Sequence, residues 1–210
     1  MSERTSEDIL REQYFNIVPD IRRVPMYLEA EVRYRTRKIL QELKPHEQLV
    51  VRSRVKECES AARSLRRRQE GGTFDPERAA DYSLLRLPDL AGVRVLVFPR
   101  KRMIEVDEAL RTLFTDWAFD PVPDDRGGVL APKYVGKCHS VSGEIQAEYH
   151  VVPMLIGLYW QIEHAAIYKP APKVKALKDK ADSDPMKALD ASVVRALLNF
   201  DAEFERLVRD

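Results

Sequence analysis

The sequence predicts an α/β domain with a mixed β-sheet, extended by helices at both ends of the chain. Segments with helical periodicity alternate with short, β-branched apolar runs, which is typical of this fold class. The 210 residues are 44% hydrophobic and 33% charged, as in an ordinary globular domain. No apolar run approaches the roughly 18 residues that would indicate a membrane span, so no membrane association is expected.

The first third of the chain contains two helical patterns, a strand and a third helix. In chain order these elements are predicted at residues 5–17, 24–43, 47–55 and 56–69. Pro25 suits the first turn of the second helix, and Pro45 follows its end. Gly71 and Gly72 stop the third helix and begin a predicted loop that extends to residue 86.

The rest of the chain adds the centre of the sheet and two more helices. The apolar run VRVLVF predicts a central strand within residues 89–99. The other elements are a helix at 101–114 with an apolar face of Ile104, Val106, Ala109, Leu110 and Leu113, two or three strands between 116 and 152 separated by a turn at 123–128, a helix from Pro153 to Pro170, a lysine-rich linker at 169–185, and an amphipathic helix at 186–209. We expect a helical segment at 1–46, the main domain at 47–170, and a linker with a terminal helix at 171–210.

Charge is distributed unevenly, although the formal net charge is only +1. Seven basic residues between Arg52 and Arg68 are opposed only by Glu57 and Glu59. Such a cluster suits a polyanionic ligand, and a solvated helix face is the alternative. Cys58 and Cys138 have no disulfide or zinc-ligand spacing, and the charged N-terminus lacks a signal peptide, so we expect a cytoplasmic protein with reduced thiols.

An Arg-x-Lys pair precedes the third predicted helix. Arg54 and Lys56 are two residues apart at a strand end, so their side chains point to the same face. Ser60 follows Lys56 by one helical turn. Two cations and the free N–H groups of a helix N-terminus together suit a triphosphate.

Two carboxylates stand on strands that are expected to be neighbours. Asp89 opens the central strand, and Glu148 lies in the strand that leads into Pro153. The two could share a Mg2+ ion that bridges phosphate oxygens, or accept a proton from an attacking hydroxyl. The alternative for a single Asp at a strand end is a turn or helix cap.

The helix that follows Glu148 carries polar residues that simple packing does not require. Trp160, His164 and Tyr168 fall on one stripe, which suits either a core or a binding site. His164 and Lys169 favour a nearby anion, because burying them unpaired is costly. The sequence contains no GxxxxGK[ST] or GxGxxG motif, which disfavours a P-loop or Rossmann site.

Taken together, these stretches resemble the synthetase domain of the RelA/SpoT family of (p)ppGpp synthetases, which have a nucleotidyltransferase-like sheet. The family pattern R-x-K-x-x-x-S matches Arg54, Lys56 and Ser60, and D-x-x-G-x-R matches Asp89, Gly92 and Arg94. The E-x-Q strand, with its aromatic helix ending in E-H-x-x-x-Y-K, matches Glu148, Glu163, His164, Tyr168 and Lys169. The resemblance covers about residues 50–170. The 210 residues leave no room for the hydrolase and regulatory domains of long family members, so the chain resembles the small single-domain synthetases.

The resemblance implies transfer of the β,γ-pyrophosphate of ATP to the 3′-hydroxyl of GDP or GTP. It implies that Arg54 and Arg94 hold the adenine, that Lys56 and Ser60 hold the ATP phosphates, and that Asp89 and Glu148 bind Mg2+ as the catalytic pair. On the acceptor side it implies Tyr134, which would stack on the base, together with His150, His164 and Lys169.

The acceptor side departs most from the family pattern. His150 replaces the glutamine of E-x-Q, Ser64 replaces a lysine, and KYVGKCH (133–139) matches the G-Y-R-S-x-H loop only loosely. Three hypotheses therefore stay open: a guanine-nucleotide pyrophosphokinase, a toxic synthetase that modifies the tRNA 3′ end or adenine nucleotides, and a non-catalytic binding descendant. The corresponding candidate partners are ATP with an acceptor nucleotide, tRNA, an antitoxin protein and a second copy of the chain.

Overall fold

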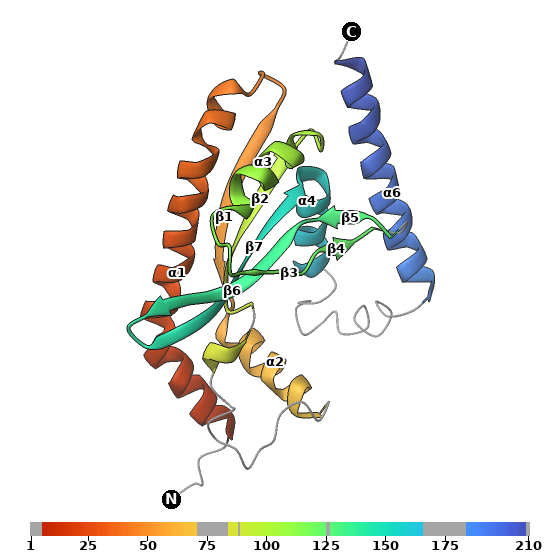
Figure 1. Ribbon diagram of the computed structural model, residues 1–210. Helices are drawn as coiled ribbons and strands as arrows, with labels where there is room; N and C mark the ends of the chain where they lie inside the picture. The colour runs from red at the N-terminus through yellow and green to blue at the C-terminus, as the bar shows by residue number, and fades with distance from the viewer. Residues whose placement is uncertain (1–5, 71–83, 88, 125–126, 166–183, 209–210) are drawn as a thin grey trace, which may run out of the picture.

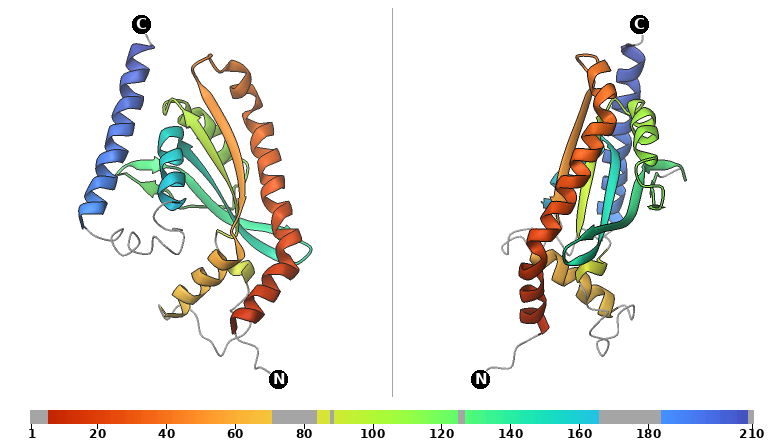
Figure 2. Two further views of the ribbon diagram at one scale, coloured as in Figure 1. Left: turned by 180° about the vertical axis from the view of Figure 1, so that it is seen from behind. Right: turned by 60° about the vertical axis from the view of Figure 1, so that its left-hand side comes forward.

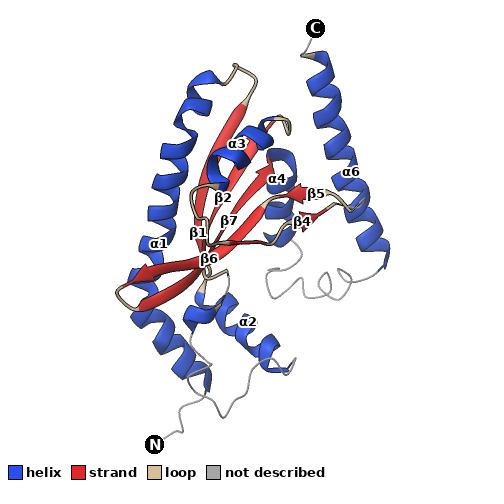
Figure 3. Ribbon diagram, in the orientation of Figure 1, coloured by secondary structure: helices blue, strands red, loops and turns tan. Residues whose placement is uncertain are grey.

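A five-stranded mixed sheet organises the molecule (Figures 1 and 3). The computed structural model describes residues 6–70, 84–87, 89–124, 127–165 and 184–208. In spatial order the strands are β1 (Gln48–Val55), β2 (Ala91–Phe98), β7 (Gly143–Pro153), β6 (Lys133–Ser140) and β3 (Ala118–Phe119). β2 and β7 run parallel, and the other neighbours are antiparallel. The predicted α/β fold with a mixed sheet is confirmed.

Helices cover both faces of this sheet. The long helix α1 (Ser6–Glu42) and α3 (Arg102–Arg111) contact each other and lie on one face. Helix α4 (Met154–Glu163) packs on β2 and β7 from the opposite face, as the front and rear views show (Figures 1 and 2). Helix α2 (Cys58–Glu70) follows β1 in the chain, and α6 (Asp184–Leu207) is the last described helix. None of the described helices is long and apolar enough to cross a membrane.

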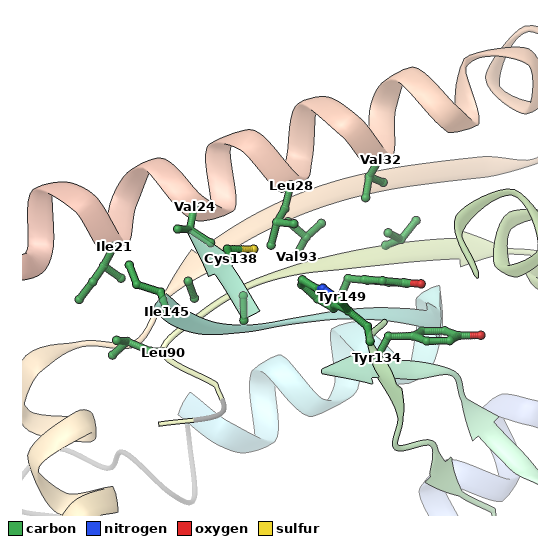
Figure 4. Packing of buried hydrophobic residues seen from close by; sticks show 14 of the residues in the cluster. Ile21, Val24, Leu28, Val32, Leu90, Val93, Tyr134, Cys138, Ile145 and Tyr149 are labelled. Carbon is green, nitrogen blue, oxygen red and sulfur yellow. The ribbon is translucent and has the colours of Figure 1, made fainter. Parts of the chain in front are cut away.

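Strand alternation gives the two faces different chemistry. Along β7, Ile145, Tyr149 and Val151 join the main apolar core, which is formed with α1 and α3 (Figure 4). The alternate positions of the strand, such as Glu148, His150 and Val152, point to the α4 face, where Val152 packs with Leu96 in a second, smaller cluster. Because side chains alternate along a strand, Glu148 faces α4 rather than the main core.

The prediction of two separate N-terminal helices is wrong. Residues 6–42 form one 37-residue helix that contains Pro19 and Pro25. A proline in a helix removes a hydrogen bond and clashes with the preceding turn. Packing outweighs this penalty, because Ile21, Val24 and Leu28 on the same helix are buried against the sheet. The predicted 1–46 segment thus contributes to the core of the main domain.

The described residues between 116 and 153 form five strands rather than the predicted two or three. Three of them are very short: β3, β4 (Val122–Pro123) and β5 (Val129–Ala131), of which the last two form a separate ribbon. Strands of two or three residues carry too little alternation to be read from sequence. The apolar face of α3 also differs, because Met103 is buried and Ile104 is 66% exposed.

Helix α6 docks through carboxylates as well as apolar side chains. Asp201 accepts a hydrogen bond from the backbone N–H of Arg100 at 2.9 Å, and Glu205 accepts one from that of Lys101 at 2.8 Å. These contacts satisfy free N–H groups at the start of α3, where no side chain of α3 provides a cap. Near the other end of α6, Asp190 accepts a 2.8 Å hydrogen bond from the Tyr159 hydroxyl of α4.

Candidate active site

The sheet brings the three sequence motifs together on its α4 face. The register places Arg54 of β1 opposite Gly92 of β2, and Gly92 opposite Glu148 of β7. A second row crosses the sheet two residues away from the first and consists of Arg52, Arg94, His150 and Lys133. Residues that are 94 positions apart in the chain, such as Arg54 and Glu148, therefore share one surface.

Two cations and two carboxylates pair at the centre of this surface. A terminal nitrogen of Arg54, Nη2, lies 2.9 Å from Glu148 Oε1 and 3.8 Å from Asp89 Oδ2. The Lys56 ammonium forms an ion pair with Asp89. One guanidinium nitrogen thus reaches both acids, so the carboxylates converge as the sequence predicts.

The close approach of Glu148 explains why the central strand has a glycine at position 92. A Cβ atom added to Gly92 would lie 2.9 Å from the backbone oxygen of Glu148 and 3.0 Å from its Cγ. Such distances are too short for real contacts, and the obstruction includes backbone. The glycine of D-x-x-G-x-R therefore makes room for the Glu148 side chain, a role that the motif alone did not reveal.

The end of β1 is held firmly beside Asp89. The Lys56 N–H donates to the Leu90 carbonyl at 2.9 Å, and the Tyr14 hydroxyl of α1 donates to the Lys56 carbonyl at 2.9 Å. Lys56 is therefore anchored through both of its backbone polar groups. Ser60 follows in the first turn of α2, where free helical N–H groups face outward from the helix end.

Glu148 is kept ionised in spite of its burial. Burial alone would raise the pKa of this carboxyl, but His150, Arg54 and Lys133 outweigh burial and lower the pKa to about 2. His150 Nε2 lies 3.5 Å from Glu148 Oε2, and this nitrogen is buried with no hydrogen-bond partner among the described residues. Arg54 thus lies beside one carboxylate oxygen of Glu148 and His150 beside the other. In this position His150 contacts the acid, whereas the sequence predicts that it contacts the acceptor nucleotide.

A groove of about 480 Å³ lies between the arginines of β1 and β2 and the end of α4. Arg52, Arg54 and Arg94 line it on the sheet side, and Trp160 and His164 line it on the helix side. Arg52 Nη1 donates to the Gln161 Oε1 atom at 2.7 Å, which ties α4 to β1. Helix α4 buries its first turns and presents its last turn to the arginines, which explains the polar residues at that end.

Arg94 is the most constrained cation of the groove. Burial, with added repulsion from Arg54, lowers its pKa, and within the described part of the chain its side chain makes no hydrogen bond or ion pair. Arg94 is partly buried, and removing a cation from water without giving it a partner is costly. An anionic or aromatic ligand in the groove would offset that cost.

The predicted acceptor residues do not gather as a group. Tyr134 is buried on the α1/α3 face, where its hydroxyl donates to Asp107 at 2.9 Å and its ring stacks on Tyr149 with centroids 4.7 Å apart. This position does not favour the predicted stacking role, because strand alternation turns Tyr134 away from Glu148, and the role stays a prediction. His164 is exposed at the end of α4, and Tyr168 and Lys169 lie outside the described residues.

Sequence reasoning missed two contributors to the site. Lys133 lies opposite His150 on β6, pairs with Asp120 and helps to lower the pKa of Glu148. Arg52 lies opposite Arg94 in the second row and donates a hydrogen bond to Gln161. The spacing of two between Arg52 and Arg54 was the available signal for Arg52, whereas Lys133 required the β6–β7 register.

The carboxylate pair fits a magnesium ion that is shared with a phosphate ligand. Mg2+ is usually bound by one or two carboxylates plus substrate phosphates, and the oxygens of Asp89 and Glu148 converge on one nitrogen. The described residues contain no group of three or more His, Cys, Asp and Glu side chains suited to a metal. Among the described residues, Asp89 and Glu148 are the two carboxylates that this site would offer, and nucleotide phosphates and water would complete the shell.

Comparison with solved structures identifies the fold. The small alarmone synthetase 1 of Bacillus subtilis bound to its product pppGpp superposes with a TM-score of 0.64 at 17% identity, covering 93% of this chain and 96% of that one. The same enzyme bound to AMPCPP gives 0.56 at 17% identity, covering 95% and 100%. A GTP pyrophosphokinase family protein of Streptococcus pneumoniae gives 0.59 at 19% identity, with 94% of each chain covered. This chain has the fold of the small alarmone synthetases.

Sequence comparison adds nothing to this assignment, since no family model and no curated protein matches the chain. At identities of 17–19% the similar structures establish the alarmone synthetase fold, and the chemistry must be argued from the site.

Proposed function

We propose that this protein is a Mg2+-dependent pyrophosphokinase that transfers the β,γ-pyrophosphate of ATP to the 3′-hydroxyl of GDP or GTP. The observation that carries the proposal is the convergence of Arg54, Lys56, Asp89 and Glu148 on one face of the sheet. Cations for a triphosphate and carboxylates for its metal are what such a transfer requires. The alarmone synthetase fold supports the same activity, because similar structures have been solved with AMPCPP and with pppGpp.

The groove residues supply the ATP side of the site. Arg54 and Arg94 border the groove, and their planar guanidinium groups suit stacking on the adenine. Lys56 and the α2 N-terminus near Ser60 suit the phosphates. Holding the nucleotide in this way aligns the β-phosphorus with the acceptor, which is the main source of acceleration in phosphoryl transfer.

The transfer itself needs no covalent nucleophile from the protein. The acceptor 3′-oxygen attacks the β-phosphorus, the bond from that phosphorus to the α,β-bridging oxygen breaks, and AMP leaves. Glu148 is ionised at neutral pH, so it can accept a hydrogen bond and then the proton from the attacking hydroxyl. Asp89 and Glu148 would hold Mg2+, which neutralises charge on the transferred group when it is bound.

The acceptor is proposed from the fold rather than from a base-stacking residue. The buried position of Tyr134 leaves the guanine without its predicted stacking partner. The tRNA 3′ end and adenine nucleotides therefore stay in the experiment as alternative acceptors, and ATP binding without turnover stays as the signature of a non-catalytic descendant.

The test is incubation of the full chain with Mg2+ and ATP labelled at the γ-phosphate, together with GDP, GTP, AMP, ADP or tRNA. We expect label transfer to GDP or GTP with release of AMP. Glu148→Gln and Asp89→Asn should each lower the rate by about 10³-fold, the effect of removing a key charge-stabilising group.

A matched control comes from the same strand. Glu144 lies on β7 four residues before Glu148, is exposed and pairs with Lys137. Glu144→Gln should retain the wild-type rate. Transfer to tRNA alone would replace the guanine-nucleotide assignment, and an absence of transfer to every acceptor would refute pyrophosphokinase activity.

A further inference from the structure

The two cations and the two acids of the site are paired with each other. Arg54 bonds Glu148 at 2.9 Å and approaches Asp89 to 3.8 Å, while Lys56 pairs with Asp89. Two positive and two negative groups leave this cluster without net charge. The Arg54 nitrogen also reaches both carboxylates at once, where an ion shared by them would have to bind.

This pairing conflicts with metal binding in the absence of nucleotide. A divalent cation is attracted to two carboxylates, but two cations within ion-pair distance of the same oxygens oppose that attraction. Arg54 and a metal ion would compete for the same carboxylate oxygens. ATP resolves the conflict, because its phosphates offer new partners to arginine and lysine.

We infer that Arg54 and Lys56 prevent free divalent cations from binding to the carboxylate pair. The pair becomes available to a metal only when the phosphates of ATP replace the carboxylates as partners of Arg54 and Lys56. This inference rests on the proposed function, and it adds an order of binding: the metal enters with ATP or after it. Arg54 is suited to exchange partners, because its side chain is 46% exposed on the groove wall. Lys56 is 14% exposed and anchored through its backbone, so only its ammonium has to change partners.

The experiment measures Mn2+ binding to the nucleotide-free full chain from the electron paramagnetic resonance signal of the free ion. Wild-type protein should bind Mn2+ weakly. Arg54→Gln should strengthen binding at least ~10-fold, because it removes a unit charge in contact with both acids. Adding Glu148→Gln to Arg54→Gln should abolish the gain, which would place the gained ion at this carboxylate pair.

Arg52→Gln is the matched control. It removes the same charge from the same strand and face, but Arg52 pairs with Gln161 rather than with an acid. It should leave Mn2+ affinity near the wild-type value. Tight Mn2+ binding by the wild type, or equal gains in the Arg54 and Arg52 variants, would overturn the inference. Circular dichroism melting identifies any variant that is misfolded, and Arg54→Lys, which keeps the charge, should bind Mn2+ as weakly as the wild type.

A second arm separates this inference from the proposed function. Calorimetric titration of the wild type with AMPCPP should show binding that strengthens with Mg2+. Failure to bind AMPCPP with Mg2+ would count against the proposed function itself. AMPCPP binding combined with unchanged Mn2+ affinity in Arg54→Gln would refute only the guarding role of Arg54.

Discussion

Two adjacent residues of β7 show how differently the faces of the sheet are built. Tyr149 is fully buried among α1, α3 and Tyr134, and its hydroxyl reaches the carbonyl of Leu110 at 3.2 Å. Glu148, one position earlier, lies among Arg54, His150 and Lys133. The first face is held by apolar burial, and the second carries charged groups, of which Arg54 and Lys56 pair with Glu148 and Asp89.

Under the proposed function, stability and activity are divided between the two faces. The α1/α3 face carries the main apolar core, whose burial is the dominant favourable term in folding. The α4 face places polar and charged groups at positions where a folded domain gains little from them. Substitutions on the first face should change mainly the free energy of unfolding, and those on the second mainly the rate.

The largest effect on stability is expected from the core face. Leu28 is fully buried between α1 and the sheet. Leu28→Ala should lower the free energy of unfolding by about 2–5 kcal/mol, through lost burial and the cavity left behind. Urea denaturation followed by circular dichroism measures this loss, and the kcat of the remaining folded protein should change little.

Leu189→Ala supplies the control, because Leu189 is 55% exposed on α6. A surface substitution of this kind should change stability by less than ~0.5 kcal/mol. Equal losses at the two positions would contradict the assignment of the main core to the α1/α3 face.

The next effect concerns His150, whose Nε2 lies 3.5 Å from Glu148. If His150 positions the carboxylate, His150→Leu should lower kcat about 10- to 100-fold, as loss of an outer-shell partner does, with little change in the KM for ATP. His150→Gln should restore much of the rate, because its amide can donate a hydrogen bond to Glu148.

Steady-state kinetics with each substrate varied would decide between two roles. A raised KM for the acceptor with an unchanged kcat would support the acceptor-binding role predicted from sequence. His139→Leu, at an exposed histidine of β6, should leave both constants at their wild-type values.

The smallest effect is expected at Tyr134. Tyr134→Phe removes the hydroxyl that donates to Asp107, and Arg111 Nη2 still bonds that carboxylate at 2.6 Å. The free energy of unfolding should fall by about 1 kcal/mol, the net worth of one hydrogen bond. Burial and the bond to Asp107 raise the pKa of Tyr134 to about 12, so its hydroxyl should stay protonated near neutral pH.

Tyr134→Leu completes this test by removing the ring. Below its melting temperature the variant should keep the wild-type KM for the acceptor, because the ring faces the core. A severalfold rise in that KM, with stability unchanged, would restore the predicted stacking on a guanine base.

Strong local signals made much of the fold predictable. The β-branched, apolar composition of β2 and the amphipathic periodicity of α2 and α6 are enough to reveal the type of each element. The two prolines of α1 misled the prediction, because a local penalty was outweighed by packing that only the assembled sheet provides. The short strands β3 to β5 likewise depend on their partners rather than on their own pattern.

By itself, the sequence singled out the residues that we propose for the chemistry: Arg54, Lys56, Asp89 and Glu148 belong to short local motifs whose spacing can be read without knowledge of the fold. Only the tertiary structure decided which of them meet and on which face. Strand register aligns Arg54, Gly92 and Glu148 across three strands, and a shift of one residue exchanges the site face for the core face, as Tyr134 shows. Register is set by contacts between distant segments, so the information is not present in any one motif.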